Sequence, residues 1–528
     1  MPLPLQERAL SAEADAIVRM TLDDLGQPFE PATVVTSLIP DRPLKPGEQY
    51  RFHFNMTKCI GCRSCEIACN EQNGNPADIR WRRIGEIEGG SYPDTLRHYL
   101  SMGCNHCLDA DCVKGCPVDA YTKDPVTGIV LHSADACIGC QYCVWNCPYS
   151  VPQFNPERGV VGKCDMCHGR LTDGLEPACV NACPEAAIEI EIVDTTAWRI
   201  DYAAAESPGM PAAGLTISTT RITQPHQSTA VLERVDAGRI HPEHAHLSLV
   251  FMTTLIQAVT GALAAALLAN TAGAPLLTLL VIITATALNI SVFHLGRPAY
   301  AWRALKMWRR SWLSREVLLI GLFFVSLSVL TAASWISLFH SLPPRLLSSL
   351  DLIATLLGIA GIIASAFIYL VPARPAWNMP HTPIDFLLSA ALLGSTLPSV
   401  LASTAALIAP IIHLSFLTTT STTRYATWPA QLTPALWLIN QSIRLVRLNR
   451  SILFENRASA ALLNTTDLRA ALILSFGLVF SSAVLASVGN FNLAFAAVFA
   501  GVLLSRYLFF VSVVPLNMAL TFTRGGDR

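Results

Sequence analysis

The spacing of apolar residues divides the chain into two parts. Before residue 245, short apolar stretches alternate with polar and charged residues, whereas from residue 247 onward Leu, Ala, Ile, Val, Ser and Thr form long uncharged runs. A helix that spans a bilayer needs about 20 mainly apolar residues. The second part is therefore predicted to be an all-α polytopic membrane bundle. By this rule it has about eight transmembrane helices, at 247–269, 274–294, 315–339, 349–371, 383–401, 403–420, 468–488 and 492–515.

Two features of the apolar part are less regular. The fifth and sixth predicted spans are separated only by Pro398 and a few small residues, which must supply a tight turn. Residues 431–466 interleave four arginines with Leu and Ile. This pattern suits an amphipathic helix lying at the membrane interface better than a spanning helix.

The same patterning predicts four segments. Residues 1–48 contain seven prolines and no sustained periodicity, and an extended N-terminal arm is expected there. Residues 49–191 contain all the cysteines and form the predicted head. Residues 192–245 are interpreted as a linker that wraps a partner or the head itself, and residues 246–520 as the membrane anchor domain.

The sixteen cysteines form four groups of four, all between Cys59 and Cys183. The first and third groups follow C-x2-C-x2-C-x3-C, the run of bacterial ferredoxins, except that Asn70 replaces the proline after the first group. The other two have longer gaps before their third cysteine, interpreted as loop insertions. The groups are Cys59, Cys62, Cys65, Cys69; Cys104, Cys107, Cys112, Cys116; Cys137, Cys140, Cys143, Cys147; and Cys164, Cys167, Cys179, Cys183.

Disulfides and zinc are the alternatives to iron–sulfur clusters. Small secreted domains do not space their bridges in this way, and residues 1–20 lack the basic start and apolar run of a secretory or twin-arginine signal. Zinc takes four ligands in two pairs and would leave the third cysteine of each triplet without a role. The spacing favours 4Fe-4S clusters, in which three thiolates of a run hold one cube and the fourth reaches its neighbour. Spacing alone leaves open which groups are partners.

The segment at 121–140 supports a ferredoxin-like α+β fold for the head. An alternating strand, a Pro-x-x-Gly turn and a second strand lead directly into the third cysteine group. Three histidines lie near the cysteines, and we interpret them as exposed loop polarity rather than as ligands: His98, His106 and His168.

Over residues 50–190 the four groups resemble the four-cluster electron-transfer subunit of the dimethyl sulfoxide reductase family of molybdopterin enzymes. The resemblance implies four 4Fe-4S clusters, with the first group partnered by the fourth and the second by the third. The implied ligand sets are Cys59, Cys62, Cys65 with Cys183; Cys164, Cys167, Cys179 with Cys69; Cys104, Cys107, Cys112 with Cys147; and Cys137, Cys140, Cys143 with Cys116.

The apolar part resembles the eight-helix, quinol-oxidising anchor subunit of the same reductases. The similarity consists of short motifs in the same order, so the chain resembles a fusion of two subunits that are usually separate polypeptides. The motifs are EHAHLSLVFMTTLIQAVTG at 243–261, FHLGRPAYAWRAL at 293–305, SWLSREV at 311–317, PARPAWN at 372–378, TPIDFLLSA at 382–390 and SRYLFF at 505–510.

This resemblance implies that His294 and Glu316 belong to a quinol site. Arg506 lies inside the last predicted span, where an ionisable side chain favours a functional interpretation and a carboxylate partner, either Glu316 or Asp385. Menaquinol or ubiquinol is expected to donate hydrogen bonds to the histidine and the glutamate. No haem is expected, because His413 is the only deep histidine and has no evident mate.

The expected partners follow from what the chain contains. A formal net charge of -1 gives no reason to expect nucleic-acid binding. No molybdopterin-binding part is visible, so we expect a separate molybdopterin-containing catalytic subunit, together with the quinol pool and the lipid bilayer. The chain would then carry the quinol-oxidation half-reaction only. A quinone-reducing partner of a membrane-bound dehydrogenase and a redox-sensing membrane protein are the alternatives.

Basic residues predict the orientation in the plasma (inner) membrane. They gather in the connections after the second and the sixth predicted spans, both on the side of the head, which predicts a cytoplasmic head. The resemblance leaves the other side open, because in well-known members a twin-arginine signal on the catalytic subunit carries the head outward. The basic residues are Arg297, Arg303, Lys306, Arg309, Arg310, Arg315, Arg424, Arg444, Arg447, Arg450, Arg457 and Arg469.

Overall fold

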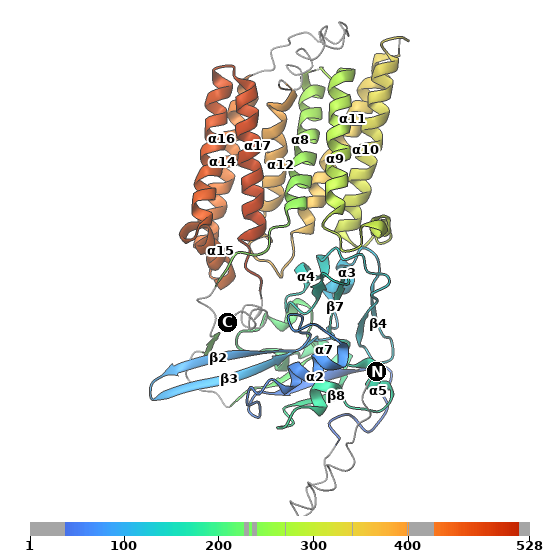
Figure 1. The fold of residues 1–528 in the computed structure, drawn as a ribbon, viewed down its shortest axis with the longest axis vertical. Helices are drawn as coiled ribbons and strands as arrows, with labels where there is room; N and C mark the ends of the chain where they lie inside the picture. The colour runs from blue at the N-terminus through green and yellow to red at the C-terminus, as the bar shows by residue number, and fades with distance from the viewer. Residues whose placement is uncertain are drawn as a thin grey trace, which may run out of the picture.

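The computed structural model describes residues 37–225, 232–234, 240–269, 271–340, 342–398, 400 and 427–516. Within these ranges the chain forms a head of strands and short helices beneath an upright helix bundle (Figure 1). Most of the predicted arm, the predicted span at 403–420 and His413 lie outside the described residues.

The first strand of the head pairs with two strands that follow the cysteine loops. The central strand β1 (Glu48–Asn55) is antiparallel to β8 (Ile188–Asp194) and parallel to β9 (Arg221–Thr223). Alternation in β1 buries Phe52 and Phe54 on one face, opposite apolar residues of β8. The sheet thus closes the chain around the cysteine loops between its strands.

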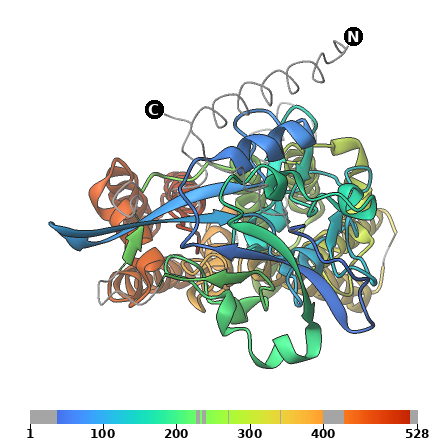
Figure 2. The ribbon, with the colours of Figure 1, turned by 90° about the horizontal axis from the view of Figure 1, so that it is seen from below.

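A long hairpin projects sideways from the head (Figures 1 and 2). It consists of β2 (Arg83–Ser91) and β3 (Asp94–Met102), with β10 (Leu232–Arg234) paired to β2. The strand–turn–strand unit predicted at 121–140 is formed by the first of two short hairpins. These are β4 (Tyr121–Lys123) with β5 (Val130–His132), and β6 (Gln153–Asn155) with β7 (Val160–Gly162).

Short helices begin within or beside the cysteine loops. Residues 192–225, interpreted as part of a linker, contribute α7, two 3-10 turns and β9 to the head, so this stretch packs on the head itself. The helices are α2 (Ser64–Asn73), α3 (Asp111–Gly115), α4 (Tyr142–Asn146), α5 (His168–Thr172), α6 (Ala178–Asn181) and α7 (Thr195–Ile200), and the turns are η1 (Ala203–Ala205) and η2 (Ala213–Leu215).

Six described helices are long and apolar enough to cross a membrane. A seventh, α12 (His381–Gly394), has 14 residues, fewer than the roughly 20 that a span needs. The predicted number of eight spans therefore stays a prediction. The six are α8 (Leu247–Ala269), α9 (Ala274–Val292), α10 (Trp312–Ile336), α11 (Pro344–Ile368), α16 (Leu468–Ser487) and α17 (Phe491–Val511), and the turn η3 (Pro298–Leu305) precedes α10.

The prediction of a single interfacial helix at 431–466 is wrong for the first half of this stretch. The structure has two helices there, α14 (Thr427–Asn449) and α15 (Phe454–Thr465), and α14 stands upright in the bundle (Figure 1), where it packs against α12 and α16. Trp437 of α14 is fully buried. The reason lies in the position of the arginines, which begin only at Arg444, near the end of α14. The preceding turns are uncharged and can pack inside the bundle.

Candidate functional site

All sixteen cysteines lie in the described head, and none of them forms a disulfide. Twelve line three separate cavities, and the other four are electrostatic neighbours of one another. The structure thus brings together the four sets that the resemblance implied. The cavity sets are Cys59, Cys62, Cys65, Cys183; Cys104, Cys107, Cys112, Cys147; and Cys116, Cys137, Cys140, Cys143, and the fourth set is Cys69, Cys164, Cys167, Cys179.

The spread of each set tests the kind of metal group that fits. Four thiolates at 2.3 Å from one zinc ion would lie about 3.8 Å apart. Among the described residues, the only group of three or more ligand atoms that lie within 4.8 Å of one another is His53, Glu189 and Glu191. The cysteine sets are therefore too wide for a single ion. A cube with an iron at each corner suits this wider spread.

Burial controls the protonation of the thiols. It raises the pKa of Cys65, Cys69 and Cys140 to about 12. These groups are protonated at neutral pH until a metal binds, because only a thiolate is a ligand. Cluster insertion at these positions therefore releases protons.

Backbone amides donate to several cysteine sulfurs. The Gly139 amide donates to Cys137 Sγ at 3.4 Å, and the Ala120 amide donates to Cys116 Sγ at 3.3 Å. A donor to sulfur favours the thiolate and the more reduced cluster. Gly139 itself has a positive φ of +70°, which glycine adopts without strain.

Buried side chains link the four cysteine sets into a series. Arg82 has electrostatic interactions with cysteines of the first and fourth groups, and Lys163 has them with Cys104 and Cys164. Tyr121 interacts with both Cys112 and Cys143. The series therefore runs from the Cys59 set through the Cys164 set and the Cys104 set to the Cys137 set.

The prediction that His106 is exposed loop polarity is wrong. Its side chain is fully buried, and its Nδ1 accepts the Val130 amide at 3.0 Å. Burial and the charge of Lys163 lower its pKa well below the usual value, which keeps the ring neutral. His98 and His168 are half-buried.

The Cys137 set lies directly against the bundle. A methyl group on Gly296 would approach the Gly159 carbonyl oxygen to 2.2 Å, and one on Gly139 would approach the Gly296 Cα to 2.8 Å. The Arg297 amide donates to the Ile138 carbonyl at 3.1 Å. Only glycine permits this approach of two backbones. We call Gly139, Gly159 and Gly296 the glycine junction.

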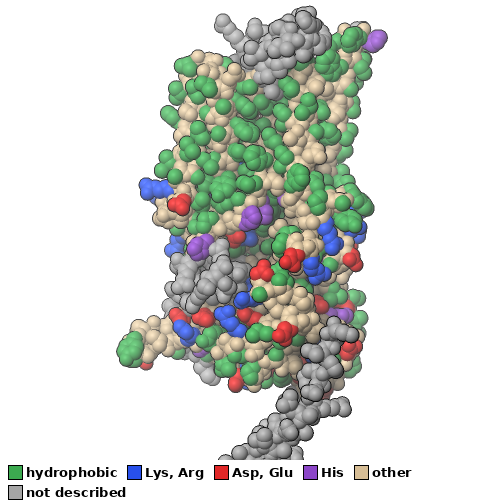
Figure 3. Space-filling model, viewed as in Figure 1, with side chains coloured by type: hydrophobic (Ala, Val, Ile, Leu, Met, Phe, Trp, Pro, Cys, Tyr) green, Lys and Arg blue, Asp and Glu red, His purple; other side chains and the backbone are tan. Residues whose placement is uncertain are grey.

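Ion pairs also join the head to the connection between α9 and α10. Asp119 of the head pairs with Arg310 at 3.1 Å and with Lys306 at 3.6 Å. Figure 3 shows charged side chains gathered where the apolar bundle meets the head. The basic connection after α9, which the sequence placed on the side of the head, therefore contacts the head itself.

An aromatic group that sequence reasoning missed joins the Cys137 set to the bundle. Trp145 lies between Cys143 and Cys147 and packs against four rings from the part of the chain after residue 245. The distances between ring centroids are 6.4 Å or less. A tryptophan placed between two ligand cysteines, beside a region rich in aromatic residues, could have signalled it. The four rings belong to His246, Tyr369, Trp377 and Phe510.

His294 follows α9 on the side of the head. Its Nδ1 donates to the Ser291 carbonyl, and burial lowers the pKa of the ring to about 4. The ring is therefore neutral at physiological pH, with Nε2 available as an acceptor. His246 is its electrostatic neighbour.

Glu316 and Arg506 are both buried but do not pair with each other. Arg506 pairs with Asp385 at 3.2 Å, one of the two partners expected, and Glu316 interacts with Tyr142 of the head. Both residues interact with Tyr369. Among the described residues, no hydrogen bond or ion pair joins His294 to Glu316.

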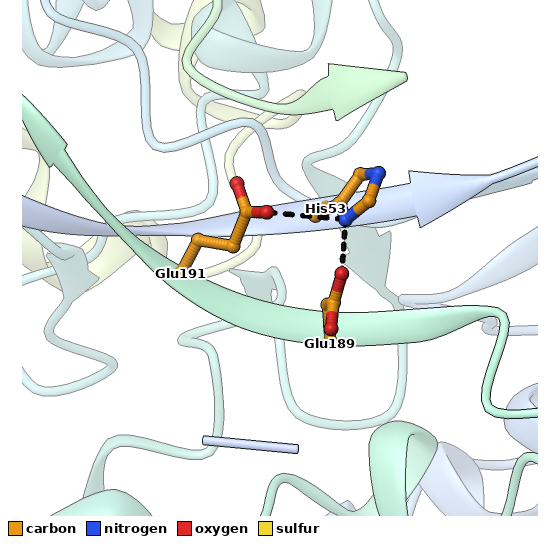
Figure 4. Close-up of side chains that lie close together, drawn as sticks. All are labelled: His53, Glu189 and Glu191. Atoms are coloured by element: carbon orange, nitrogen blue, oxygen red, sulfur yellow. Dashed lines mark hydrogen bonds and ion pairs between the residues drawn. The ribbon is translucent and has the colours of Figure 1, made fainter. Parts of the chain in front are cut away.

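His53, Glu189 and Glu191 form the one cluster with metal-ligand spacing in the described residues (Figure 4). Arg51 pairs with Glu191 at 2.8 Å, and Arg221 pairs with the same carboxylate. Two guanidinium groups thus neutralise Glu191, and Glu189 contacts the His53 ring. The cluster is therefore an ion-pair network that ties β1, β8 and β9 together rather than a metal centre.

A cysteine-rich ferredoxin-like head fixed to apolar helices defines the class of membrane-anchored iron–sulfur electron-transfer proteins. Residues 96–192 match the family described as "4Fe-4S dicluster domain". Residues 240–511, just over half of the chain, match the family described as "DMSO reductase anchor subunit (DmsC)". The chain belongs to this anchor family and carries an iron–sulfur subunit in the same polypeptide.

Relatives of the head are subunits of anaerobic reductases and formate dehydrogenases. A subunit of the anaerobic dimethyl sulfoxide reductase of Haemophilus influenzae is 36% identical over 188 residues, covering 34% of this chain and 87% of that protein. The corresponding subunit of the Escherichia coli K12 reductase is 37% identical over 168 residues, covering 30% and 82%. The formate dehydrogenase-O iron-sulfur subunit of the same strain is 38% identical over 153 residues, covering 25% and 50%.

Proposed function

We propose that this protein is the electron-transfer and membrane-anchor subunit of a molybdopterin oxidoreductase of the dimethyl sulfoxide reductase type. In this proposal it oxidises menaquinol or ubiquinol in the membrane. It then passes electrons through the head to a separate catalytic subunit. The observation that carries the proposal is the series of four cysteine sets that begins at the glycine junction and ends at the far side of the head.

We assign a 4Fe-4S cluster to each of the four cysteine sets. When bound, such clusters supply one-electron carriers. The chain supplies four sulfur ligands for each cluster, amide donors to the sulfurs and a dry surrounding that separates the sets from water. The ligand pairing and the number of clusters are part of the proposal.

The Cys59 set is the proposed exit toward the catalytic subunit. Cys62 is the one exposed cysteine of the sixteen, and Ile60 and Ile67 beside it are 58% and 60% exposed. Exposed apolar side chains around a redox group suit a protein contact. This set is also the one furthest from the bundle in the series.

Quinol is proposed to bind between His294 and Glu316 at the head end of the bundle. The neutral His294 ring would accept a hydrogen bond from one quinol hydroxyl at Nε2 and take up its proton as the quinol is oxidised. Glu316 would accept the hydrogen bond and the proton of the second quinol hydroxyl. The rings packed around Trp145 would keep water from the path to the Cys137 set.

A quinone-reducing role is the second candidate. Its support is the 38% identity to a formate dehydrogenase iron-sulfur subunit. The sidedness of the head is also proposed: the basic connection after α9 supports a cytoplasmic head by the positive-inside rule.

The test uses the intact protein in membranes, prepared without oxygen. Iron and sulfide analysis should give four iron atoms for each of the four sets. Low-temperature EPR should show that a menaquinol analogue reduces the clusters, that His294→Gln abolishes this reduction, and that dithionite still reduces the clusters in the variant. The matched control is His340→Gln, an exposed histidine beyond the far end of α10.

The same preparation separates the two candidate directions. Fewer than four clusters, or reduction by quinol that His294→Gln leaves unchanged, would contradict the proposed assignments. Oxidation of pre-reduced clusters by a quinone, without reduction by quinol, would favour the dehydrogenase partner.

A further inference from the structure

Arg82 is a buried cation between two cysteine sets. Its side chain is 2% exposed, and its electrostatic neighbours are four sulfurs, one from the Cys59 set and three from the Cys164 set. Its backbone amide also donates toward Cys69. The neighbouring sulfurs belong to Cys179, Cys164, Cys65 and Cys69.

The surroundings hold the guanidinium in one place. It lies over the Phe52 ring at 4.4 Å, and its Nη1 donates at 3.2 Å to Ser101, whose hydroxyl is 3.6 Å from Cys65 Sγ. A methyl group on Gly103 would come within 3.0 Å of Nη2, so the glycine leaves just enough room. The Phe52 ring, the Ser101 hydroxyl and the Gly103 backbone therefore restrict the position of the guanidinium.

No carboxylate neutralises Arg82 in the described part of the chain. Its Nε and Nη2 atoms are buried and have no hydrogen-bond partner among the described residues. An unpaired buried cation costs several kcal/mol unless negative charge lies nearby. The sulfur ligands are the negative charge that these surroundings offer.

Lys163 occupies the same kind of position one step further along the series. It is 3% exposed, and its neighbours are Cys104 and Cys112 of one set, Cys164 of the next and, with a smaller effect, the carboxylate of Asp165. Its Nζ donates to the carbonyl oxygens of Val130 and Cys164. These carbonyls orient the ammonium group but do not neutralise it.

We infer that Arg82 and Lys163 are positioning charges that hold up the reduction potentials of the cluster sites they separate, with the Cys164 set shared between them. This inference rests on the proposed function, because it assumes a cluster in each set. A cluster with four thiolate ligands is negatively charged, and reduction adds one more negative charge. A fixed cation in a medium of low dielectric favours the reduced state.

The sharing of one set predicts a specific pattern. Arg82→Gln should lower the potentials of the Cys59 and Cys164 sets, and Lys163→Gln those of the Cys164 and Cys104 sets. Each single variant should therefore move two potentials. The double variant should move three rather than four, and the Cys137 set should move in none of them.

The measurement is a redox titration of the intact protein in membranes, followed by EPR, with iron content measured on each sample. We expect each affected potential to fall by at least about 59 mV, a tenfold change for a one-electron couple. Arg82→Lys retains the charge and should leave the potentials near those of the parent. Arg97→Gln removes the same charge from an exposed position on β3 and should move none.

Each outcome decides the inference. Unchanged potentials in both Gln variants with full iron content would overturn it, as would an equal shift in Arg97→Gln. If Arg82→Gln loses iron, the test rests on Lys163→Gln alone. Two lowered potentials in that variant support the inference, and unchanged potentials overturn it. Failure of the proposed function is distinct, because it would appear in the parent protein as fewer than four clusters.

Discussion

Gly296→Ala tests the contact between the head and the bundle. The added methyl group would lie 2.2 Å from the Gly159 carbonyl oxygen and 2.6 Å from its carbon. Both are backbone atoms, so no side-chain rotation relieves the clash. The two backbones must separate until the closest contact reaches at least 3.0 Å, which real Cβ atoms require.

The cost of this separation can be estimated from overpacking. Forcing an extra methyl group into a packed site costs about 1–3 kcal/mol, which is roughly 5- to 150-fold in an equilibrium constant. We call the head seated when the glycine junction is closed and unseated when it is open. The ratio of seated to unseated molecules should fall by this factor. The hydrogen bond from the Arg297 amide to the Ile138 carbonyl, 3.1 Å long, should open in the unseated state.

Two assays follow the effect. Quinol-driven reduction of the clusters should slow in Gly296→Ala, whereas dithionite reduction should not change, because dithionite does not pass through the junction. Hydrogen exchange should rise in residues 293–311. The matched control is Gly321→Ala in α10, where the added methyl group has no atom within 4 Å and alanine favours the helix. Unchanged exchange and unchanged quinol reduction in Gly296→Ala would refute the close contact.

Three further predictions concern single groups. Asp385→Asn should destabilise the bundle by about 3–5 kcal/mol, because it leaves the buried Arg506 without its carboxylate partner. Thermal inactivation measures this loss of stability, and an unchanged inactivation midpoint would contradict the prediction. Trp145→Ala should slow the reduction of the clusters by quinol, although the variant keeps its full iron content. A reduction rate equal to that of the parent protein would contradict a role of Trp145 in the path from quinol to the clusters. Burial raises the pKa of Glu191, but hydrogen bonds from His53 and Arg221 outweigh burial and lower the pKa to about 2. The ionised carboxylate therefore stabilises the folded head fully above pH 4.5, and this stabilisation is lost as the pH falls toward 2. Glu191→Gln should reduce amide protection in β1 at pH 7 but not at pH 2, and an equal reduction at both would exclude the carboxylate.

Cysteine spacing predicted the iron–sulfur head because ligand geometry is local. The run from Cys59 to Cys69 places two sulfurs on a loop and two on the helix α2 that follows it, within eleven residues of the chain. Apolar runs likewise predicted the six spanning helices to within a few residues. Both signals need only short-range information.

The features that sequence reasoning missed depend on long-range packing. The burial of His106 follows from the approach of β5 and Lys163, which the loop around His106 does not encode. The upright position of α14 depends on α12 and α16, against which its uncharged turns pack. For the carboxylate partner of Arg506, the sequence left two candidates, Glu316 and Asp385. The structure shows that the partner is Asp385.

The joining of head and anchor in one polypeptide changes what the glycine junction has to do. Two separate subunits must hold such a contact by its own binding free energy at their cellular concentration. Here β9 fixes the connecting segment to the head, and the chain enters α8 at Leu247, so the two surfaces remain at a high effective concentration. The contact consists of the glycine junction, the ion pairs of Asp119 and the rings around Trp145, and it does not have to hold two separate chains together. A substitution at the junction should therefore change the seated fraction of the head independently of protein concentration, which distinguishes it from dissociation of a subunit.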